Sequence, residues 1–478
     1  MSGELRAIAA AAEAGAPAGE LLALKLPDAY RGVVVRREDA EALAGVPVAE
    51  RDPAQTLHVD EVPVPELAPD EALVAVMASA INFNTVWSAL FAPVPTFAFL
   101  ERNGRRSPHW ARHDQPYHVL GSDAAGVVLR TGAGVTRWKA GDRVTVHGAY
   151  VDPEAPEGHD DSMLDPNVCA WGYETNFGGL AELAVCKATQ LLPKPAHLTW
   201  EEAACNGVSN STVYRQLVSA NGASMKQGDV VLVWGASGGI GSYAIQYALN
   251  GGAYPVAVVS SPERAELVRA AGCELVIDRR AEGFRFFDGD RPDPKEMRRF
   301  RTRVRELTGG QDPEVVFEHT GRETFATSVY VAARGGAVVT CASTTGYAHA
   351  YDNRYLWTGL KRIVGTHIAN LAEAARANRL VARGAIHPAL WRVFPLDGIR
   401  EAVELMHANR HCGKVGIVCL AEEEDRGVTD RAFRERHLGA IRRWRASEVH
   451  DAGEDPDGPE PPAGPFEREP QEVHHARP

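Results

Sequence analysis

The sequence contains no closely spaced cysteine pair. Its seven cysteines are scattered between Cys169 and Cys419 without a CxxC motif. Disulfide frameworks and structural zinc sites use cysteines at short spacings, so this pattern favours reduced thiols in a cytosol. No run of about 18 apolar residues occurs, and the first residues, MSGELRAIAAAAEAG, lack a basic-then-apolar signal sequence. We therefore predict a cytoplasmic protein without a membrane segment.

An excess of positive charge is also missing. The chain has 51 Lys and Arg against 63 Asp and Glu, a formal net charge of -12. No overall field therefore attracts nucleic acid or anionic lipid, and we expect neither as a partner. Any phosphate group that the protein binds must meet a local basic site.

Two domains are expected, because 478 residues exceed what one hydrophobic core usually holds. Residues 57–76 read as short strands broken by prolines, which indicates a β-rich first part. Four later apolar runs, each followed by a helical stretch, predict a parallel sheet covered on both faces. These runs are VVLVWG (230–235), PVAVVS (255–260), EVVFEH (314–319) and AVVTCA (337–342). A helix and a strand within 395–420 would return to complete the first domain.

The segment VVLVWGASGGIGSYAIQYAL indicates a dinucleotide-binding turn. A strand runs into a glycine-rich turn that opens an amphipathic helix, which lets backbone amides and the helix N-terminus face a pyrophosphate. The alternative is a merely tight turn, but a second strand follows at the expected place. The predicted cofactor-binding residues of this turn are Gly235, Ser237, Gly238, Gly239, Ile240 and Gly241.

The end of the second strand favours NADPH over NADH. NAD sites usually place an acid there, whereas this chain has Ser260 and Ser261 followed by Arg264. Two hydroxyls and a guanidinium can bind a 2′-phosphate, while Glu263 would point outward from the first helical turn. Arg279 either adds charge on the adenine side or is a solvated surface arginine.

Several segments resemble the crotonyl-CoA carboxylase/reductases of the medium-chain dehydrogenase/reductase superfamily. They run in order from about residue 25 to about residue 420, and two segments separate this family from quinone oxidoreductases and other enoyl reductases. These two segments are WGYETNFGG (171–179) and YDNRYLWTGLKRIVGTHIAN (351–370).

The resemblance implies an α/β fold with two domains and a tail. A GroES-like, β-rich catalytic domain would comprise residues 1–212 and 381–424, and a doubly wound Rossmann domain would comprise residues 213–380. The charged, Pro-rich residues 425–478 are expected to form a disordered acidic tail, with a short helix allowed before residue 446, because 450–478 bury too little apolar surface to offset their ordering entropy. A homo-oligomer, either dimer or tetramer, is also implied.

The same resemblance bears on zinc. Ser122 and Asp123 stand where zinc alcohol dehydrogenases have a Gly-His-Glu, and their structural cysteine lobe is missing. We therefore assign no metal and expect metal-free hydride transfer.

In this family a hydride from NADPH reduces an enoyl-CoA, and the resulting enolate captures CO2 to give an alkylmalonyl-CoA. The resemblance implies four catalytic residues. Asn84 would donate to a CO2 oxygen, Glu174 would orient a water, and His367 would hold CO2 through that water. Tyr173 stands where the family has Phe, which adds a hydroxyl near the reacting centre. Each also has a structural alternative: a cap or turn for Asn84, a surface acid for Glu174, and a core histidine for His367.

CoA recognition is assigned to Arg354 and Tyr355, which the resemblance puts near the adenine and phosphates. The alternative is a helix start capped by Asp352 with ordinary surface residues. Two other functions stay open: a non-carboxylating enoyl-CoA or quinone reductase, and a non-enzymatic NADPH-binding protein. The acyl chain length is open as well.

Overall fold

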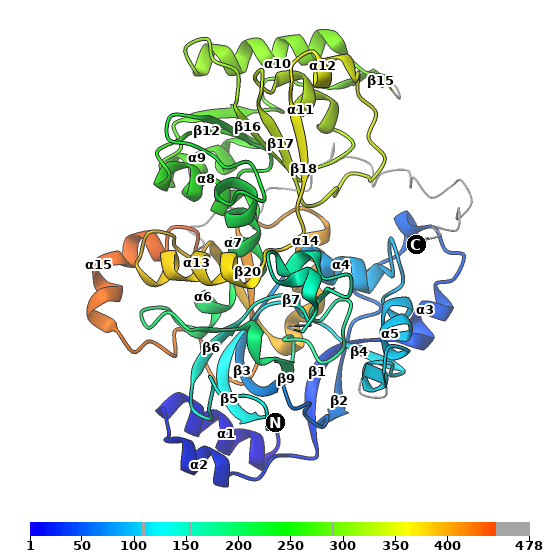
Figure 1. Ribbon diagram of the computed structural model, residues 1–478, viewed down its shortest axis with the longest axis vertical. Coiled ribbons are helices and arrows are strands. Elements are labelled where there is room, and N and C mark those ends of the chain that lie inside the picture. The colour runs from blue at the N-terminus through cyan, green and yellow to red at the C-terminus, as the bar shows by residue number, and fades with distance from the viewer. Residues whose placement is uncertain (108–109, 153, 289–290, 446–478) are drawn as a thin grey trace.

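The computed structural model describes residues 1–107, 110–152, 154–288 and 291–445, and every statement below refers to these ranges. Two domains lie one above the other in Figure 1, with the Rossmann domain at the top and the GroES-like domain below. The fold is therefore the predicted α/β combination. No helix within the described ranges has the length and hydropathy needed to cross a membrane.

The GroES-like domain is built on a seven-stranded, mostly antiparallel sheet. Its strands follow the order β10 (Leu191–Pro193), β6 (Arg143–Val146), β5 (Ala124–Thr131), β3 (Glu71–Ile81), β20 (Lys414–Val418) and β19 (Leu390–Pro395), with β9 (Leu183–Lys187) also on β3. A three-stranded sheet adjoins it, in the order β2 (His58–Pro63), β1 (Ala29–Arg36) and β4 (Tyr117–Val119). Strand β3 is buried at every position, and two register shifts against β5 curve the sheet.

The Rossmann domain holds a six-stranded parallel sheet. Its order is β13 (Leu275–Asp278), β12 (Tyr254–Val259), β11 (Val230–Val233), β16 (Val315–Glu318), β17 (Ala337–Thr340) and β18 (Arg362–Gly365). The four predicted apolar runs form β11, β12, β16 and β17. Alternate residues serve the two faces, as strand geometry requires: Val231 and Val233 pack with α8 (Gly241–Asn250), whereas Val230 and Leu232 pack with α10 (Pro294–Leu307).

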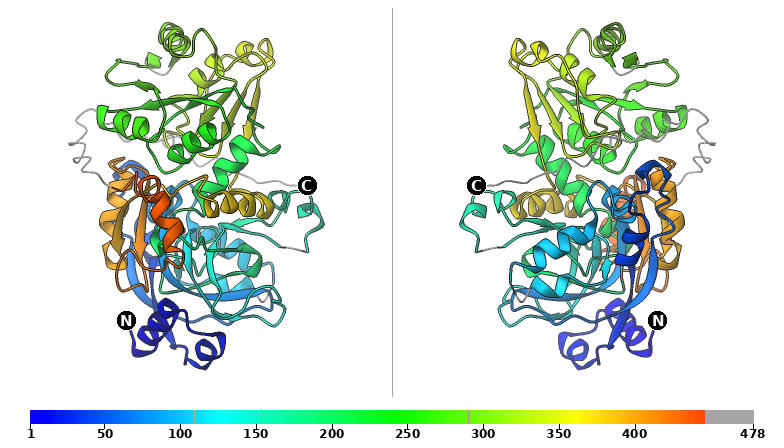
Figure 2. Two further views of the ribbon diagram at one scale, coloured as in Figure 1. Left: turned by 90° about the vertical axis from the view of Figure 1, so that its left-hand side faces the viewer. Right: turned by 90° about the vertical axis from the view of Figure 1, so that its right-hand side faces the viewer.

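The remaining helices cover these sheets and connect the domains (Figure 2). They are α1 (Gly3–Ala14), α2 (Ala18–Ala23), α3 (Arg37–Ala42), α4 (Phe83–Leu90), α5 (Thr96–Gly104), α6 (Trp200–Ala204), α7 (Val208–Val213), the π-helix η6 (Tyr214–Val218), α9 (Pro262–Ala270), α11 (Phe325–Val331), α12 (Arg354–Trp357), α13 (Leu371–Ala382), α14 (Ile399–His407) and α15 (Arg431–Ile441). Two short strand pairs complete the fold: β7 (Ala149–Tyr150) with β8 (Cys169–Ala170), and β14 (Phe287–Asp288) with β15 (Arg291–Pro292).

The predicted domain boundaries fall inside helices. Helix α7 and η6 run together through the boundary at 212/213, and α13 runs through the boundary at 380/381. Both boundaries therefore stay predictions. The predicted helix and strand within 395–420 are α14 and β20, and β20 lies beside β3 in the first domain's sheet.

The first part of the predicted tail contains the short helix that the sequence allowed, and it is packed rather than loose. Residues 425–445 fold against the GroES-like domain: α15 lies within them, and Ile441 and Trp444 are buried. Arg434 of α15 also forms an ion pair with the buried Glu202. These apolar and paired side chains stabilise a segment that its overall charge made look unstructured. The rest of the predicted tail, 446–478, lies outside the described residues.

Candidate active site

The glycine-rich turn lies at the carboxyl end of β11. Gly235 has a φ of 54°, a left-handed conformation that favours glycine, and it lies next to the ring of His319 at the end of β16. A Cβ on Gly241 would lie 2.3 Å from the Gly235 carbonyl oxygen, so α8 can begin this close to the turn only with glycine. Strand order reverses between β11 and β16, and ligands of such sheets bind at this switch point. The turn therefore fits a dinucleotide, as predicted.

The residues predicted to select NADPH lie at the start of α9. Ser261 is the N-cap of this helix and accepts a hydrogen bond from the Arg264 backbone N–H at 3.3 Å. The Arg264 guanidinium is buried and donates to Ser237 Oγ at 3.1 Å and to the Asn409 carbonyl at 2.6 Å. Arg264 thus joins the glycine-rich turn to the GroES-like domain, a contact that the sequence did not predict. Ser260 is half-buried at the end of β12.

Two charged groups flank that helix start. Glu263 is exposed, and a hydrogen bond from the Ser261 side chain lowers the pKa of its carboxyl, so this carboxylate lies beside Ser261. Arg279 follows β13, is half-buried and has Glu323 at 3.8 Å. Its charge is therefore partly balanced rather than fully solvated.

Asn84 lies in the first turn of α4, which follows β3 directly. Its Nδ2 donates to Ser122 Oγ at 2.7 Å, and Ser122 is buried in the loop just before β5. A carboxamide has a second N–H, for which the described residues provide no acceptor. One N–H of the half-buried Asn84 amide therefore has no acceptor among the described residues, and its role in binding a ligand stays a prediction.

Tyr173 and Glu174 lie in the loop after β8. Gly172 has a φ of 66°, and a Cβ there would lie 2.0 Å from the Gly121 carbonyl oxygen, so this loop packs directly beside Ser122. The Tyr173 ring lies 6.3 Å from Trp87 of α4 and 5.6 Å from Phe99 of α5. The loop therefore reaches the helix that carries Asn84.

The electrostatics of this loop follow from its burial. Desolvation, with a smaller contribution from Glu174, raises the pKa of the Tyr173 hydroxyl well above its usual value. Glu174 Oε2 accepts from the Ala170 N–H at 2.7 Å, and Oε1 lies 3.9 Å from Arg102. Glu174 is consequently held in place by its own turn, with its second oxygen facing a solvated arginine.

His367 lies between β18 and α13 and its side chain is exposed. It is not a core histidine. The next residue, Ile368, has a φ of 47°, which is strained for a β-branched side chain, and it is buried with Ala170 in a cluster against which Tyr173 packs. The 366–370 segment therefore lies beside the Tyr173 loop, while no contact between His367 and Asn84 or Glu174 is seen within the described part.

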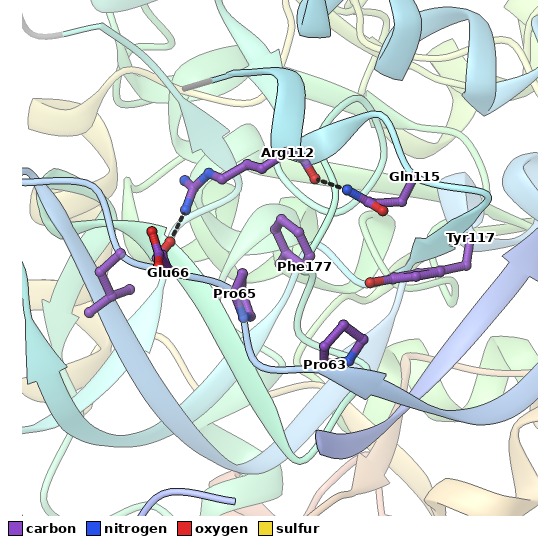
Figure 3. Close-up of a pocket in the computed structure, with 8 residues that line it drawn as sticks. Pro63, Pro65, Glu66, Arg112, Gln115, Tyr117 and Phe177 are labelled. Atoms are coloured by element: carbon purple, nitrogen blue, oxygen red, sulfur yellow. Dashed lines mark hydrogen bonds between the residues drawn. The ribbon is translucent and has the colours of Figure 1, made fainter. Parts of the chain in front are cut away.

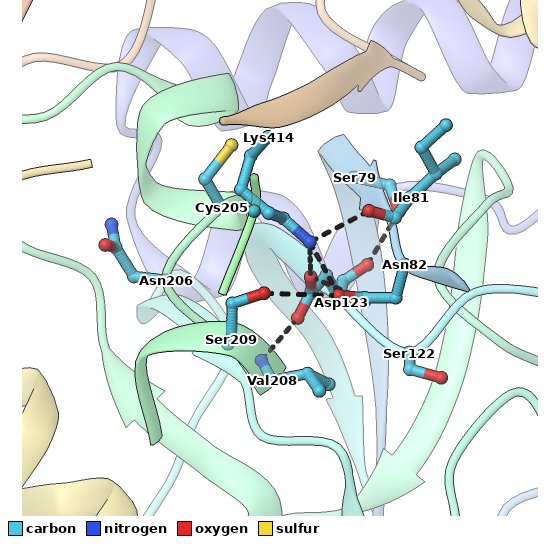
Figure 4. Close-up of polar contacts among 12 residues, drawn as sticks. Ser79, Ile81, Asn82, Ser122, Asp123, Cys205, Asn206, Val208, Ser209 and Lys414 are labelled. Atoms are coloured by element: carbon cyan, nitrogen blue, oxygen red, sulfur yellow. Dashed lines mark hydrogen bonds and ion pairs between the residues drawn. The ribbon is translucent and has the colours of Figure 1, made fainter. Parts of the chain in front are cut away.

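A buried ion pair that the sequence did not reveal lies beneath Asn84. Lys414, at the start of β20, donates to Asp123 Oδ2 at 3.0 Å, to Asn82 Oδ1 at 2.6 Å and to the Ile81 carbonyl at 2.8 Å (Figure 4). Asp123 and Lys414 are 291 positions apart, so no local pattern could have paired them. At Ser122 and Asp123 the sequence indicates only that a zinc-ligand pattern is missing.

Within the described ranges, no group of three or more His, Cys, Asp or Glu side chains is arranged so that it could hold a metal ion such as zinc. At the position compared with zinc dehydrogenases, Ser122 binds Asn84, and Asp123 is used by Lys414 and the Val208 N–H. The residues present therefore do not fit a metal.

Two surface pockets differ in character. One, of about 500 Å³, lies along α10 and is basic; its lining is Arg298, Arg301, Thr302, Arg305, Glu306 and Tyr330. Tyr355 stands edge-on to Tyr330 with ring centroids 4.9 Å apart, whereas the exposed Arg354 is bound to Asp352, which also caps its backbone N–H. Tyr355 therefore lies beside the basic pocket, and the helix start predicted as the alternative is present too.

The second pocket, of about 350 Å³, lies in the GroES-like domain near β2 (Figure 3). Its lining contains none of the predicted site residues: Pro63, Pro65, Glu66, Leu67, Arg112, Gln115, Tyr117 and Phe177. We assign no function to it.

Comparisons with known proteins identify the class first. Residues 68–196 match the alcohol dehydrogenase GroES-like domain, and residues 239–383 match the zinc-binding dehydrogenase domain. This pair of domains, around a dinucleotide turn, defines a medium-chain dehydrogenase/reductase.

Individual relatives narrow the class to one family. The chain is 58% identical to a crotonyl-CoA reductase of Streptomyces collinus over 90% of this chain and 96% of that one. It is 39% identical to a crotonyl-CoA carboxylase/reductase of Cereibacter sphaeroides, over 75% and 83%. The solved 2-octenoyl-CoA carboxylase reductase CinF, in complex with NADP and 2-octenoyl-CoA, is 53% identical, with a TM-score of 0.88 over 92% of this chain and 99% of that one. The protein belongs to the crotonyl-CoA carboxylase/reductase family.

Proposed function

We propose that the protein catalyses NADPH-dependent reductive carboxylation of an α,β-unsaturated acyl-CoA. The observation that carries this proposal is the position of Asn84: its amide is held by Ser122 beside the Tyr173–Glu174 loop, with one N–H left for a ligand. Relatives of this degree of identity, named for crotonyl-CoA and 2-octenoyl-CoA, support the substrate class.

The cofactor would bind at the carboxyl end of the parallel sheet. Backbone amides from Gly235 to Gly241 and the N-terminus of α8 would hold the pyrophosphate, since this end of a helix carries partial positive charge. Ser260, Ser261 and the charge of Arg264 would favour the 2′-phosphate of NADPH. Bound NADPH supplies the hydride.

Carbon–carbon bond formation would take place beside Asn84. Hydride adds to the β-carbon, the electron pair moves onto the thioester as an enolate, and the α-carbon attacks CO2 to leave a carboxylate. The free N–H of Asn84 would donate to a CO2 oxygen, and Glu174 and His367 would hold the opposite side through a water. When CO2 is missing, a proton takes its place and the saturated acyl-CoA results.

The basic pocket along α10 suits the 3′-phosphate and adenine of CoA. Three arginines, Arg298, Arg301 and Arg305, line it on a chain that is acidic overall. Asp312 pairs with Arg301 and lies 3.9 Å from Arg305, so these two arginines would have to exchange that carboxylate for phosphate, and the Arg301 guanidinium lies over the Tyr330 ring. Tyr355 would support that ring. Arg354 can contribute only after exchanging Asp352 for a phosphate.

Self-association would use the edge of the parallel sheet. Strand β18 is the last strand of its sheet, and two large apolar side chains next to it, Trp357 and Leu360, are 57% and 65% exposed. An unpaired strand edge beside an apolar patch suits a second copy related by two-fold symmetry. We propose a homo-oligomer, acting in the cytoplasm where acyl-CoA and NADPH are available.

One assay separates carboxylation from the second candidate, reduction alone, which the name of the Streptomyces collinus relative favours. NADPH oxidation is followed with crotonyl-CoA and with 2-octenoyl-CoA, with and without bicarbonate plus carbonic anhydrase, and products are weighed by mass spectrometry. A carboxylated product is expected when bicarbonate is present. If only the saturated acyl-CoA forms, the protein is a reductase that does not carboxylate. If NADPH binds without turnover, the protein is a non-enzymatic binding protein.

A further inference from the structure

The buried pair of Lys414 and Asp123 lies where four elements meet. Lys414 is 2% exposed and Asp123 is fully buried. Each of the three N–H groups of Lys414 has an acceptor: the Ile81 carbonyl, Asn82 Oδ1 and Asp123 Oδ2. Asp123 also accepts from Asn82 Nδ2 at 2.8 Å and from the Val208 N–H at 2.7 Å. The ends of β3, β5, β20 and α7 are thereby fixed to one another.

Asn82 connects this ion pair to the proposed CO2 site. It is the N-cap residue of α4, yet its side chain makes no capping bond to that helix and binds Lys414 and Asp123 instead. Asn84 lies two residues further, and its amide is held by Ser122, the neighbour of Asp123. Two residues linked to the ion pair therefore fix the direction of the Asn84 carboxamide: Asn82, two positions before it in the chain, and Ser122, which accepts its hydrogen bond.

The same lysine reaches the glycine-rich turn. Gly413 N–H donates to the Ser237 carbonyl at 2.8 Å, and Gly413 forms a parallel bridge with Gly238. A Cβ on Gly239 would lie 3.3 Å from Lys414 Cδ, so the lysine stem packs beneath the turn. One side chain thus touches both the proposed cofactor turn and the helix start that leads to Asn84.

The free energy of folding alone does not explain why Lys414 and Asp123 form a buried ion pair here. Desolvating two ions costs free energy that their attraction only partly restores, and an apolar pair of similar size is often as stable. Fixed geometry is what such a pair supplies, since each bond has a defined direction.

We propose that Lys414, acting through Asp123 and Asn82, is a positioning residue for carboxylation: it fixes the Asn84 carboxamide relative to the glycine-rich turn. This inference rests on the proposed function. CO2 is small and uncharged, so its binding depends on where a few polar groups point. Movement of Asn84 should therefore divert the enolate to protonation while leaving hydride transfer largely intact.

The test measures the fraction of carboxylated product in the full-length enzyme under saturating NADPH, crotonyl-CoA and bicarbonate. Lys414→Met keeps the length of the stem beneath Gly239 and removes the charge. We expect the ratio of carboxylated to reduced product to fall about tenfold, with KM for NADPH changed by less than about threefold. Lys414→Arg should restore part of the ratio.

Lys194→Met is the matched control. Lys194 is a buried lysine of the same domain that donates to the Leu198 and Gly427 carbonyls. None of its hydrogen bonds involves Asn84, Ser122 or Asp123. It should lower the melting temperature and leave the product ratio unchanged. Where Lys414→Met does not fold, Asp123→Asn, which is isosteric, should shift the ratio in the same direction.

Each outcome decides something. A wild-type ratio in a folded Lys414→Met or Asp123→Asn variant overturns the inference and leaves the proposed function standing. An equal loss of ratio in Lys194→Met also overturns it, because general destabilisation would then explain the effect. A wild-type enzyme that yields only saturated acyl-CoA overturns the proposed function itself.

Discussion

Tyr173 adds a hydroxyl to a site where a carbanion must avoid protons. Its ring contacts Trp87 and Phe99, and burial raises the pKa of the hydroxyl far above neutrality. The raised pKa makes this phenol a weaker acid than an ordinary tyrosine, which slows proton transfer from it to the enolate. Its presence is therefore compatible with carboxylation.

This argument predicts the behaviour of Tyr173→Phe. The ring contacts stay, so the variant should fold with a stability within about 1 kcal/mol of wild type. The ratio of carboxylated to reduced product, measured by mass spectrometry with bicarbonate present, should stay equal or rise. A collapse of carboxylation would mean that the hydroxyl helps to bind CO2 or to order its water.

Arg264 gives a second prediction at this scale. Its guanidinium bonds link Ser237 of the glycine-rich turn to the Asn409 carbonyl, so Arg264→Ala removes a charge and loosens the turn. We expect KM for NADPH to rise about tenfold in initial-rate assays, the range of one charge-assisted hydrogen bond. Arg269→Ala, at an exposed position of the same helix, is the control and should change little. Equal KM values for both variants would contradict a role for Arg264.

Residues whose chemistry depends on local sequence were predictable. The glycine-rich turn of 235–241 follows from its own spacing, because strand, turn and helix adjoin in the chain. Asn84 and Glu174 needed a family resemblance, since single polar residues usually have structural roles. Lys414 could not be found either way: its partner Asp123 is 291 positions distant, and only the folded sheet makes them neighbours.

Secondary structure elements were predicted best where an apolar run was continuous. Strands β11, β12, β16 and β17 lie where such runs occur, because strands covered on both faces consist of apolar residues throughout. Strand β18 is not among the predicted apolar runs. It is a half-exposed edge strand that begins with Arg362, so it carries no apolar run. Helix α15 was predicted only as a possible short helix in a charged segment. The many charges of this segment gave no indication that Ile441 and Trp444 are buried.

The burial of Ile441 and Trp444 predicts that the segment after residue 425 contributes to the free energy of unfolding. Trp444 is 2% exposed, so Trp444→Ala should lower the free energy of unfolding by about 3–5 kcal/mol. Leu438→Ala, on the same segment but 37% exposed, should cost less than about 1 kcal/mol. Chemical denaturation followed by tryptophan fluorescence and circular dichroism measures both. Equal small losses would show that α15 does not contribute to the core.

At the scale of the whole molecule, the two-domain plan and its family were predictable, whereas the exact division between the domains stays a prediction. Composition indicates two cores, and the order of strands and helices indicates which is parallel. The predicted boundaries, 212/213 and 380/381, fall within the helical stretches α7–η6 and α13. A continuous helix has no composition change at a domain border, so the sequence offers no signal there.

Buried histidines in the GroES-like domain make the free energy of unfolding depend on pH. Desolvation lowers the pKa of His118 and of His147 to about 4, and each ring bonds a backbone carbonyl, that of Thr175 and that of Ala369 respectively. The unfolded chain has these groups near about 6.5, so between the two values the unfolded state binds more protons. Stability is therefore complete above the unfolded pKa and decreases as pH falls towards the folded one.

The consequence is measurable as a free energy of unfolding. Between about pH 7.5 and about pH 5.5, each of these histidines should remove about 1 kcal/mol. Other histidines with lowered pKa values add to the total, so guanidinium titrations of wild type and variant at the two pH values give the share of one histidine by difference. His118→Gln keeps a donor for the Thr175 carbonyl and cannot be protonated, so it should lose that share of the pH dependence. Because the Thr175 carbonyl belongs to the loop that carries Tyr173 and Glu174, protonation of His118 would also disturb the proposed CO2 site. An unchanged pH slope in His118→Gln would show that His118 titrates alike in the folded and unfolded chains.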